Sequence, residues 1–246
     1  MRCVPKINGV YWLCLGLAGL FGANAGALLS DAFGLGSPKG LPFLAAGLAL
    51  VFLAERFLTQ GSALFFWTAV VLLRTAATSI SGLLREDHIR LASVPAMCLL
   101  LAFMVIVWRS REPTTEEQGV IPINAYYWLT LFVAGVLGTV AGDTASYPLG
   151  YGFLGALVAF AIPLAFLLVI GRNGLYADLG FHWLAVVLIV SAGTAAGNLL
   201  THETVRAAEL STGISGLVFL GAIVAAYEMR TCNRSLETRT APGALP

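Results

Sequence analysis

The sequence is poor in charged residues and in the side chains on which enzyme and metal sites depend. Only 11% of its 246 residues are Asp, Glu, Lys or Arg, less than half of the roughly 25% that is usual in soluble domains. The four cysteines (Cys3, Cys14, Cys98 and Cys232) have no Cys-x-x-Cys spacing, and the three histidines form no metal-binding motif. These absences argue against a soluble domain, a disulfide framework and a structural metal site.

Several functional signatures are also missing. The sequence has no Walker loop, no Rossmann glycine fingerprint and no Gly-x-Ser-x-Gly elbow, so it predicts neither an enzyme nor a bound cofactor. The formal net charge is +1 and no basic stripe is present, which argues against a nucleic-acid partner.

Long apolar runs are what the sequence has instead. Hydrophobic residues make up 58% of the chain and gather in segments long enough for an α-helix to cross a hydrocarbon core of roughly 30 Å. The segments do not alternate with period two, so we expect an all-α, polytopic membrane bundle whose main partner is the lipid bilayer. The predicted spans lie near residues 8–30, 40–57, 62–84, 92–109, 124–146, 150–171, 180–201 and 211–229.

Four tryptophans divide the chain into a repeat. Trp12, Trp67, Trp128 and Trp183 are separated by 55, 61 and 55 residues, and each opens an apolar segment that a second one follows. Because a unit of two helices returns to the side where it began, the four copies should be parallel repeats arranged as two homologous halves. We expect a first half over residues 1–112, a cytoplasmic linker over 113–122, a second half over 123–230 and a disordered cytoplasmic tail over 231–246.

The distribution of basic residues predicts the orientation. With eight crossings, the side that holds the N-terminus carries nine Lys or Arg residues and the opposite side carries four. The positive-inside rule therefore places both termini in the cytoplasm.

Small residues recur at fixed distances from each tryptophan. Ten and fourteen residues beyond it, all four copies keep a small side chain, the spacing over which membrane helices pack closely. We therefore expect the four leading helices to form the centre of the bundle. The helix-packing positions are Gly22, Gly26, Ala77, Ser81, Gly138, Gly142, Gly193 and Gly197.

Two charged residues fall within predicted spans. Arg74 lies about midway through the third span, where insertion of a guanidinium costs about 2.5 to 3.5 kcal/mol or more, so an anion, a cavity or helix carbonyls must compensate. Asp143 lies beside a glycine-rich face and is either part of a cation or proton site or a solvated group near the headgroups. We expect no direct ion pair between the two, since they differ by eight residues in helix position, roughly 12 Å. The candidate substrate-binding residues are Asn24, Arg74, Thr78, Thr139, Asp143, Thr194 and Asn198.

The tryptophans have an ordinary interpretation as interface anchors. Trp12, Trp67, Trp128 and Trp183 stand at the cytoplasmic starts of the leading helices, next to Tyr11, Phe66, Tyr127 and His182, and such positions are typical of an aromatic belt between membrane and water.

The repeat resembles a family of uncharacterised bacterial integral membrane proteins. The likeness rests on four tandem two-helix copies, each with a tryptophan, and on Gly-Thr-x-x-Gly-Asp-like segments such as residues 138–143 and 193–198. It implies a multi-pass protein of the bacterial cytoplasmic membrane and brings no established activity. Two hypotheses about function follow from the residues: a transporter or permeation pathway for a small polar or ionic solute, and a non-transporting scaffold or sensor whose polar residues are structural. Oligomeric state is not predicted.

Overall fold

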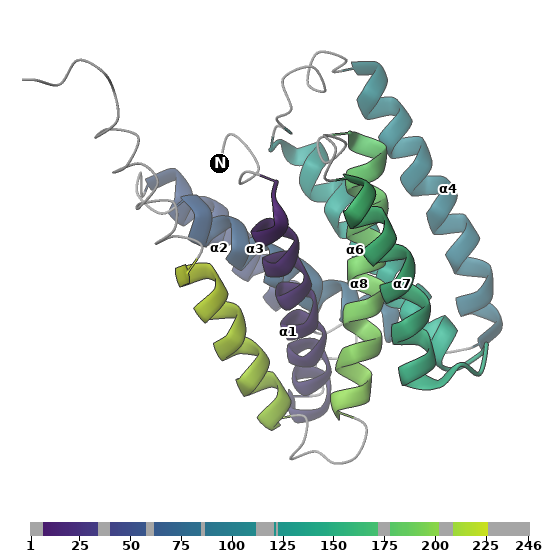
Figure 1. The fold of residues 1–246 in the computed structure, drawn as a ribbon. Helices are drawn as coiled ribbons and strands as arrows, with labels where there is room; N and C mark the ends of the chain where they lie inside the picture. The colour runs from purple at the N-terminus through teal and green to yellow at the C-terminus, as the bar shows by residue number, and fades with distance from the viewer. Residues whose placement is uncertain are drawn as a thin grey trace, which may run out of the picture.

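The computed structural model describes residues 7–33, 40–57, 62–84, 87–111, 121, 123–171, 178–201 and 209–225. These residues form eight helices and no strand. The helices are α1 (Gly9–Phe33), α2 (Leu41–Phe57), α3 (Ser62–Ser81), α4 (Asp87–Arg111), α6 (Ala125–Ser146), α7 (Gly152–Gly171), α8 (Leu179–Thr201) and a last helix, Glu209–Ala225 (Figure 1). The predicted all-α fold is confirmed over this part of the chain.

Six of these helices are long and apolar enough to cross a membrane, and two apolar segments, Leu41–Ala54 and Glu209–Ala225, are shorter. A helix suits a lipid environment because it satisfies its own backbone hydrogen bonds where no water can. The protein therefore has the character of a multi-pass helical membrane protein. Apart from Ile121, which is buried in the core, the predicted linker and tail lie outside the described residues.

The four helices that begin near a tryptophan form the core. Helix α1 packs against α3, α3 against α6, α6 against α8 and α8 against α1, which closes a ring. The other four helices lie outside it: α4 and the last helix flank the core on opposite sides (Figure 1). Burial follows this division, because 61% of the α6 span is buried and only 6% of the α7 span is. The prediction that the leading helices form the centre is confirmed.

The starts of the core helices converge at one end. The Tyr11 ring lies 5.8 Å from Trp67 and 6.0 Å from His182, and Tyr127 lies 6.3 Å from Phe66, so all four helices begin together and run in the same direction. We call this the aromatic end, and the opposite one the polar end.

The outer helices run back toward the aromatic end. In α4, Arg90 lies over Tyr147 at the polar end, and Trp108 packs against Trp183 at the aromatic end. The last helix also starts near the polar end, where Ser211 bonds Asn24, and continues toward the aromatic end, where Phe219 packs against Trp67.

Each outer helix packs against a core helix that it does not directly follow. Helix α2 contacts α3, α4 contacts α6, and α7 contacts α8. The last helix closes the cycle by contacting α1, where Gly216 lies against the Phe21 ring and Phe219 stacks on it. Each two-helix unit thus packs its outer helix against the core helix of another unit.

The small residues lie in the seams between core helices. A Cβ added at Gly22 would stand 2.5 Å from the Cβ of Arg74, and one at Gly142 would stand 3.1 Å from the Cβ of Thr194. The same relation recurs around the ring: Gly26 faces Thr78, Gly138 faces Val190, Gly193 faces Gly19, and Gly197 faces Ala23. Between α3 and α6, Ala77 lies against Gly135, and Ser81 donates a hydrogen bond to Asp143. Positions ten and fourteen beyond one tryptophan therefore meet positions seven, eleven or fifteen beyond the next.

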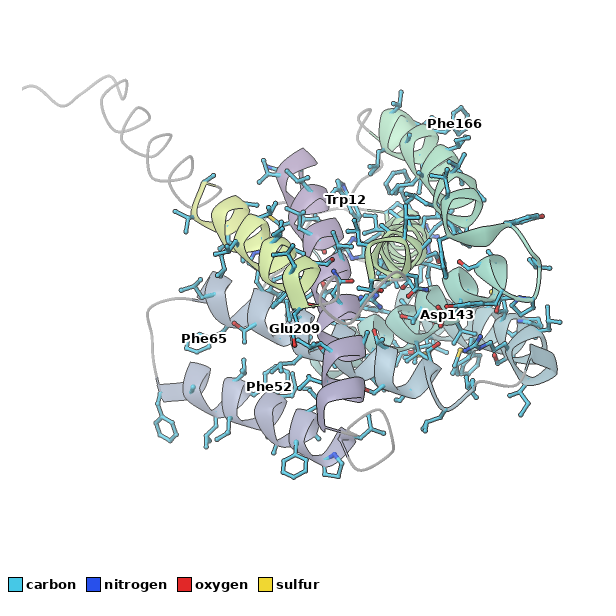
Figure 2. All side chains as sticks on the ribbon, turned by 90° about the horizontal axis from the view of Figure 1, so that it is seen from below. Trp12, Phe52, Phe65, Asp143, Phe166 and Glu209 are labelled. Carbon is cyan, nitrogen blue, oxygen red and sulfur yellow. The ribbon has the colours of Figure 1, made fainter. Side chains whose placement is uncertain are left out.

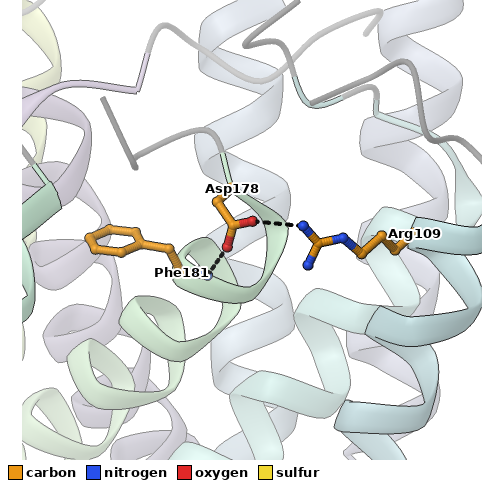
Figure 3. A network of polar contacts seen from close by, with 3 residues as sticks. All are labelled: Arg109, Asp178 and Phe181. Carbon is orange, nitrogen blue, oxygen red and sulfur yellow. Dashed lines mark hydrogen bonds and ion pairs between the residues drawn. The ribbon is translucent and has the colours of Figure 1, made fainter. Parts of the chain in front are cut away.

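Side-chain caps start three of the core helices. Asn8 and Asn124 accept hydrogen bonds from the backbone amides of Tyr11 and Tyr127 at 2.9 and 2.8 Å, which satisfies donors that a helix start leaves free. Asp178 does the same for Phe181 at 2.8 Å, and its second oxygen accepts from Arg109 of α4 at 3.4 Å (Figure 3). The start of α8 is thereby tied to an outer helix.

A tight turn connects α6 to α7. Gly150 and Gly152 have positive φ angles of 71° and 66°, a conformation that costs glycine little and other residues more. The turn is closed by bonds such as Tyr151 N to Ala145 O at 3.2 Å.

Candidate functional site

Arg74 lies inside the core and is 2% exposed. Its Nη1 atom donates to the Gly135 carbonyl at 3.0 Å and to the Thr139 hydroxyl at 3.1 Å, both on the adjacent helix α6. The side chain can reach α6 because the facing positions, Gly19 and Gly135, carry no side chain. Nε and Nη2 are buried and have no hydrogen-bond partner.

The three candidate threonines have different surroundings. Thr139 is the only one of them that contacts the guanidinium, and it also donates to its own helix at Gly135. Thr78 donates to the Arg74 carbonyl and packs against Gly26, so its hydroxyl is occupied within α3. Thr194 is buried in α8 and its Oγ1 has no hydrogen-bond partner.

Asp143 lies at the polar end and joins three core helices. Its Oδ2 accepts from Ser81 of α3 at 2.9 Å, and its Oδ1 accepts from Asn198 of α8 at 3.0 Å. Seen from the polar end, Asp143 lies among the core helices, whereas Phe166 projects from the outer side of α7 (Figure 2). The carboxylate is half-buried and well supplied with donors.

A cation lies beyond Asp143 on the same side. Arg90 of α4 donates to the Leu84 carbonyl at 2.7 Å and holds its guanidinium 5.7 Å from the centre of the Tyr147 ring. Partial burial raises the pKa of the Tyr147 phenol, with the Asp143 carboxylate acting in the same direction and Arg90 in the opposite one. The polar end therefore contains both signs of charge.

The structure contains no ion pair between Arg74 and Asp143, as the difference in their helix positions predicts. Arg74 is bonded to a carbonyl and a hydroxyl, and Asp143 to a hydroxyl and an amide. The two groups are thus held separately along the core.

Asn24 belongs to a different group from the other candidates. Its amide nitrogen donates to Ser211 at 2.8 Å and to Ser215 at 3.5 Å, both on the last helix, and its Oδ1 is buried without a partner beside Gly197. We find no direct contact between Asn24 and Arg74 or Asp143.

The tryptophans differ from the predicted belt. Trp12, Trp67 and Trp183 are buried, and only Trp128 is partly exposed. Because the helix starts converge, the tryptophan rings pack against aromatic rings of adjacent helices. Most of the four therefore anchor the bundle internally and do not line its outer surface. Trp108 of α4 joins this cluster 5.9 Å from Trp183.

The residues just before the tryptophans meet at the centre of the aromatic end. Tyr11, Phe66, Tyr127 and His182 are all buried, with ring centres 6.0 to 6.5 Å apart between neighbouring helices. The Tyr11 and Tyr127 hydroxyls and both ring nitrogens of His182 are buried without a hydrogen-bond partner. These four rings close the core at this end.

A large groove lies elsewhere on the molecule. It has a volume of about 950 Å³ and runs between α1, α7 and α8, lined by apolar residues such as Leu17, Leu164 and Ile189. It does not include Arg74 or Asp143 among its lining residues.

Sequence reasoning missed several members of the polar groups. Ser81 was assigned to packing, although a hydroxyl at a small-residue position can also bond across a seam. Ser211 and Ser215 are four residues apart, and this spacing could have marked one helix face as polar. The central position of His182 has no sequence signal apart from its place before a tryptophan.

The fold and these polar groups define a multi-pass helical membrane protein with charged side chains inside its core. A comparison with protein-family models, curated proteins and solved structures finds no significant match to this chain.

Proposed function

We propose that this protein is a transporter or permeation pathway for a small polar or ionic solute, and that the solute is bound inside the four-helix core. The observation that carries the proposal is the buried guanidinium of Arg74, which keeps two donor atoms without partners. A charge within a membrane span is costly and typically marks a solute or ion pathway. At the polar end of the same core, Asp143 with Ser81 and Asn198 supplies a polar entrance.

All eight helices cross the membrane in this proposal. Helix α1 has 25 residues, about 37 Å in length, and yet the starts of α1 and α3 are in contact. The chain must return over that length between them, and α2 is the helix that carries it back. The same argument applies to α4 and α7. The last helix runs from Ser211 beside Asn24 to Phe219 beside Trp67, which also supports four parallel two-helix repeats.

The aromatic end is the closed side of the pathway. The four rings of Tyr11, Phe66, Tyr127 and His182 fill the centre there, so movement of a solute requires them to separate. At the polar end the core is bounded by a hydroxyl, an amide and a carboxylate. In this proposal, the four rings block access to the core from the aromatic end.

Flux through proteoliposomes tests the proposal. Radiolabelled or fluorescence-detected uptake of a panel of small ions and polar solutes is compared between wild type, Arg74→Gln and Asp143→Asn. We expect at least a tenfold loss of flux in both variants, which is about 1.4 kcal/mol in barrier height. Thr68→Val is the matched control, because Thr68 lies on the exposed side of α3 and donates only to the Leu64 carbonyl. Flux equal to wild type in both core variants would remove these residues from the mechanism.

A second test probes water access. Thr139→Cys and Thr194→Cys place thiols inside the core, where both positions are now buried. Transport predicts that a membrane-impermeant maleimide labels them as the protein opens. Complete protection of both thiols under conditions of measured flux would place the pathway elsewhere.

The alternative is a scaffold or sensor with a dry interior. It is favoured by one observation: the Nη1 atom of Arg74 ties α3 to α6 through Gly135 and Thr139, as a structural lock would. In that case neither wild type nor Arg74→Met should carry flux. Arg74→Met should still fold, because an apolar residue of similar length often replaces a buried charge without loss of folding.

A further inference from the structure

The guanidinium of Arg74 has one occupied side and one free edge. Nη1 carries both of the hydrogen bonds that the side chain makes, to Gly135 and Thr139 of α6. Nε and Nη2 carry none, and both atoms are buried. The two free donors lie on the same edge of the planar group, so they point in parallel away from the occupied atom.

Parallel donors on a guanidinium edge match a particular ligand shape. An Arg presents Nε and Nη2 to two oxygens of one carboxylate-like group and forms two charge-assisted hydrogen bonds. A monatomic anion offers one centre and cannot meet both donors in this way. The free edge is thus selective for an oxyanion by geometry as well as by charge.

Among the described residues, no carboxylate bonds this edge. Asp143 is the one carboxylate among the candidate site residues, and its oxygens accept hydrogen bonds from Ser81 and Asn198. The positive charge of Arg74 therefore lies in the core with only neutral oxygens bonded to it.

A glycine of the adjacent helix lies beside the free edge. Gly19 of α1 faces it, and a Cβ added there would stand 3.9 Å from Nε. The lack of a side chain at this position leaves backbone beside the edge. Thr194 of α8 also has a buried hydroxyl without a partner, but its side chain lies against Gly142 of α6.

We propose that Arg74 binds a small oxyanion side-on through Nε and Nη2, in the core beside Gly19. The ligand class is a singly charged ion with at least two oxygens on one atom, such as formate, nitrate or bicarbonate. This inference rests on the proposed function, because it names the class of solute that the core would carry.

Binding is measured on the purified full-length protein in a neutral sugar detergent without phospholipid, so that a free ion is the only source of oxyanion. The probes are sodium formate and sodium nitrate, compared with sodium chloride at equal ionic strength. The readout is the ¹⁵Nε resonance of Arg74 in arginine-labelled protein, assigned by its loss in Arg74→Lys. In wild type we expect a saturable shift of this resonance with formate and nitrate, and an affinity for chloride at least tenfold weaker. Arg74→Lys keeps the positive charge and loses the pair of parallel donors, so its formate affinity, measured by thermal shift, should be at least tenfold weaker than that of wild type.

A control variant completes the design. Arg109→Gln, which alters an exposed guanidinium on α4, should leave formate binding unchanged. The inference is overturned if formate leaves the wild-type Nε resonance unmoved, or if Arg74→Lys binds formate as tightly as wild type. Because the resonance is followed in wild type, the first criterion stands even if a variant fails to fold.

Failure of the inference and failure of the proposed function give different results. Saturable formate binding without flux of any solute would keep the oxyanion site and reject transport. Flux of a cation or neutral solute, with no response of the Arg74 resonance to oxyanions, would keep transport and reject the oxyanion site.

Discussion

The two ends of the four-helix core are built from different chemistry. At the aromatic end, four buried rings meet, and the only nitrogens among them, those of His182, lack hydrogen-bond partners. At the polar end, the Asp143 carboxylate is satisfied by a hydroxyl and an amide from the two adjacent helices. The first end holds the helices together by packing, and the second by directed hydrogen bonds.

This difference shows how one set of parallel helices can be tight at one end and polar at the other. Rings bury a large area and exclude water, whereas a bonded carboxylate tolerates partial exposure. Between the ends lie the small-residue seams and Arg74. A core of this kind is suited to admit a solute from one side only, in keeping with the proposed function.

The largest expected effect comes from breaking the seam that connects the two ends. A side chain at Gly138 would overlap Val190, so Gly138→Leu should destabilise the protein by about 3 kcal/mol or more, or prevent folding. Unfolding in detergent, followed by circular dichroism, measures it. Gly221→Leu is the control, because a Cβ at Gly221 meets nothing within 4 Å. Equal stability of the two variants would mean that α6 and α8 are not in close contact at this seam.

The polar end can be broken at its carboxylate. Asp143→Leu leaves the Ser81 hydroxyl and the Asn198 amide without their acceptor, so we expect a loss of about 1 to 3 kcal/mol in the free energy of unfolding. Asp143→Asn keeps one acceptor oxygen and should lose less. If the Leu variant proved as stable as wild type, the carboxylate would not be the element that joins the three helices.

The aromatic end should respond in the opposite direction. His182→Phe removes two buried nitrogens without partners and keeps a planar ring, the type already present at Phe66, so we expect a gain of about 1 kcal/mol. The reverse exchange, Phe66→His, should lower stability by a similar amount. A loss of stability in His182→Phe would indicate that the imidazole has a polar partner in the folded protein.

The smallest expected effect concerns the rim of the aromatic end. Asp178→Asn removes the ion pair with exposed Arg109 and keeps the cap on Phe181, so stability should fall by less than about 0.5 kcal/mol. Asp178→Ala removes the cap as well and should cost about 1 kcal/mol. A thermal melt of the two variants side by side separates the contributions, and a larger loss in the Asn variant than in the Ala variant would contradict this assignment.

Much of the fold could be predicted because each feature is local. The observed starts of α1, α6 and α8 agree with the predicted spans to one residue, since hydrophobic length and the tryptophan mark them directly. The seam glycines were predicted from spacing, because residues four apart lie on one helix face. Arg74 was also expected inside, since its position is shared with Gly19 and Gly135.

The rest of the site depends on contacts between distant segments. The pairing of Arg74 with Thr139, 65 residues away, and of Asn24 with Ser211, 187 residues away, has no signature in either stretch alone. The tryptophans were expected to face the membrane interface, because nothing in one repeat shows that four starts converge and bury them.

The amino-acid sequence by itself determined that this protein is helical, apolar and built around four helices that begin near a tryptophan, because in lipid each segment must satisfy its own backbone. Only the tertiary structure decided which helix covers which, how Glu209–Ala225 packs on the outside of α1, and that two donors of Arg74 remain free on one edge. Those outcomes depend on side chains from several helices meeting at once, and such a meeting is a property of the packed bundle.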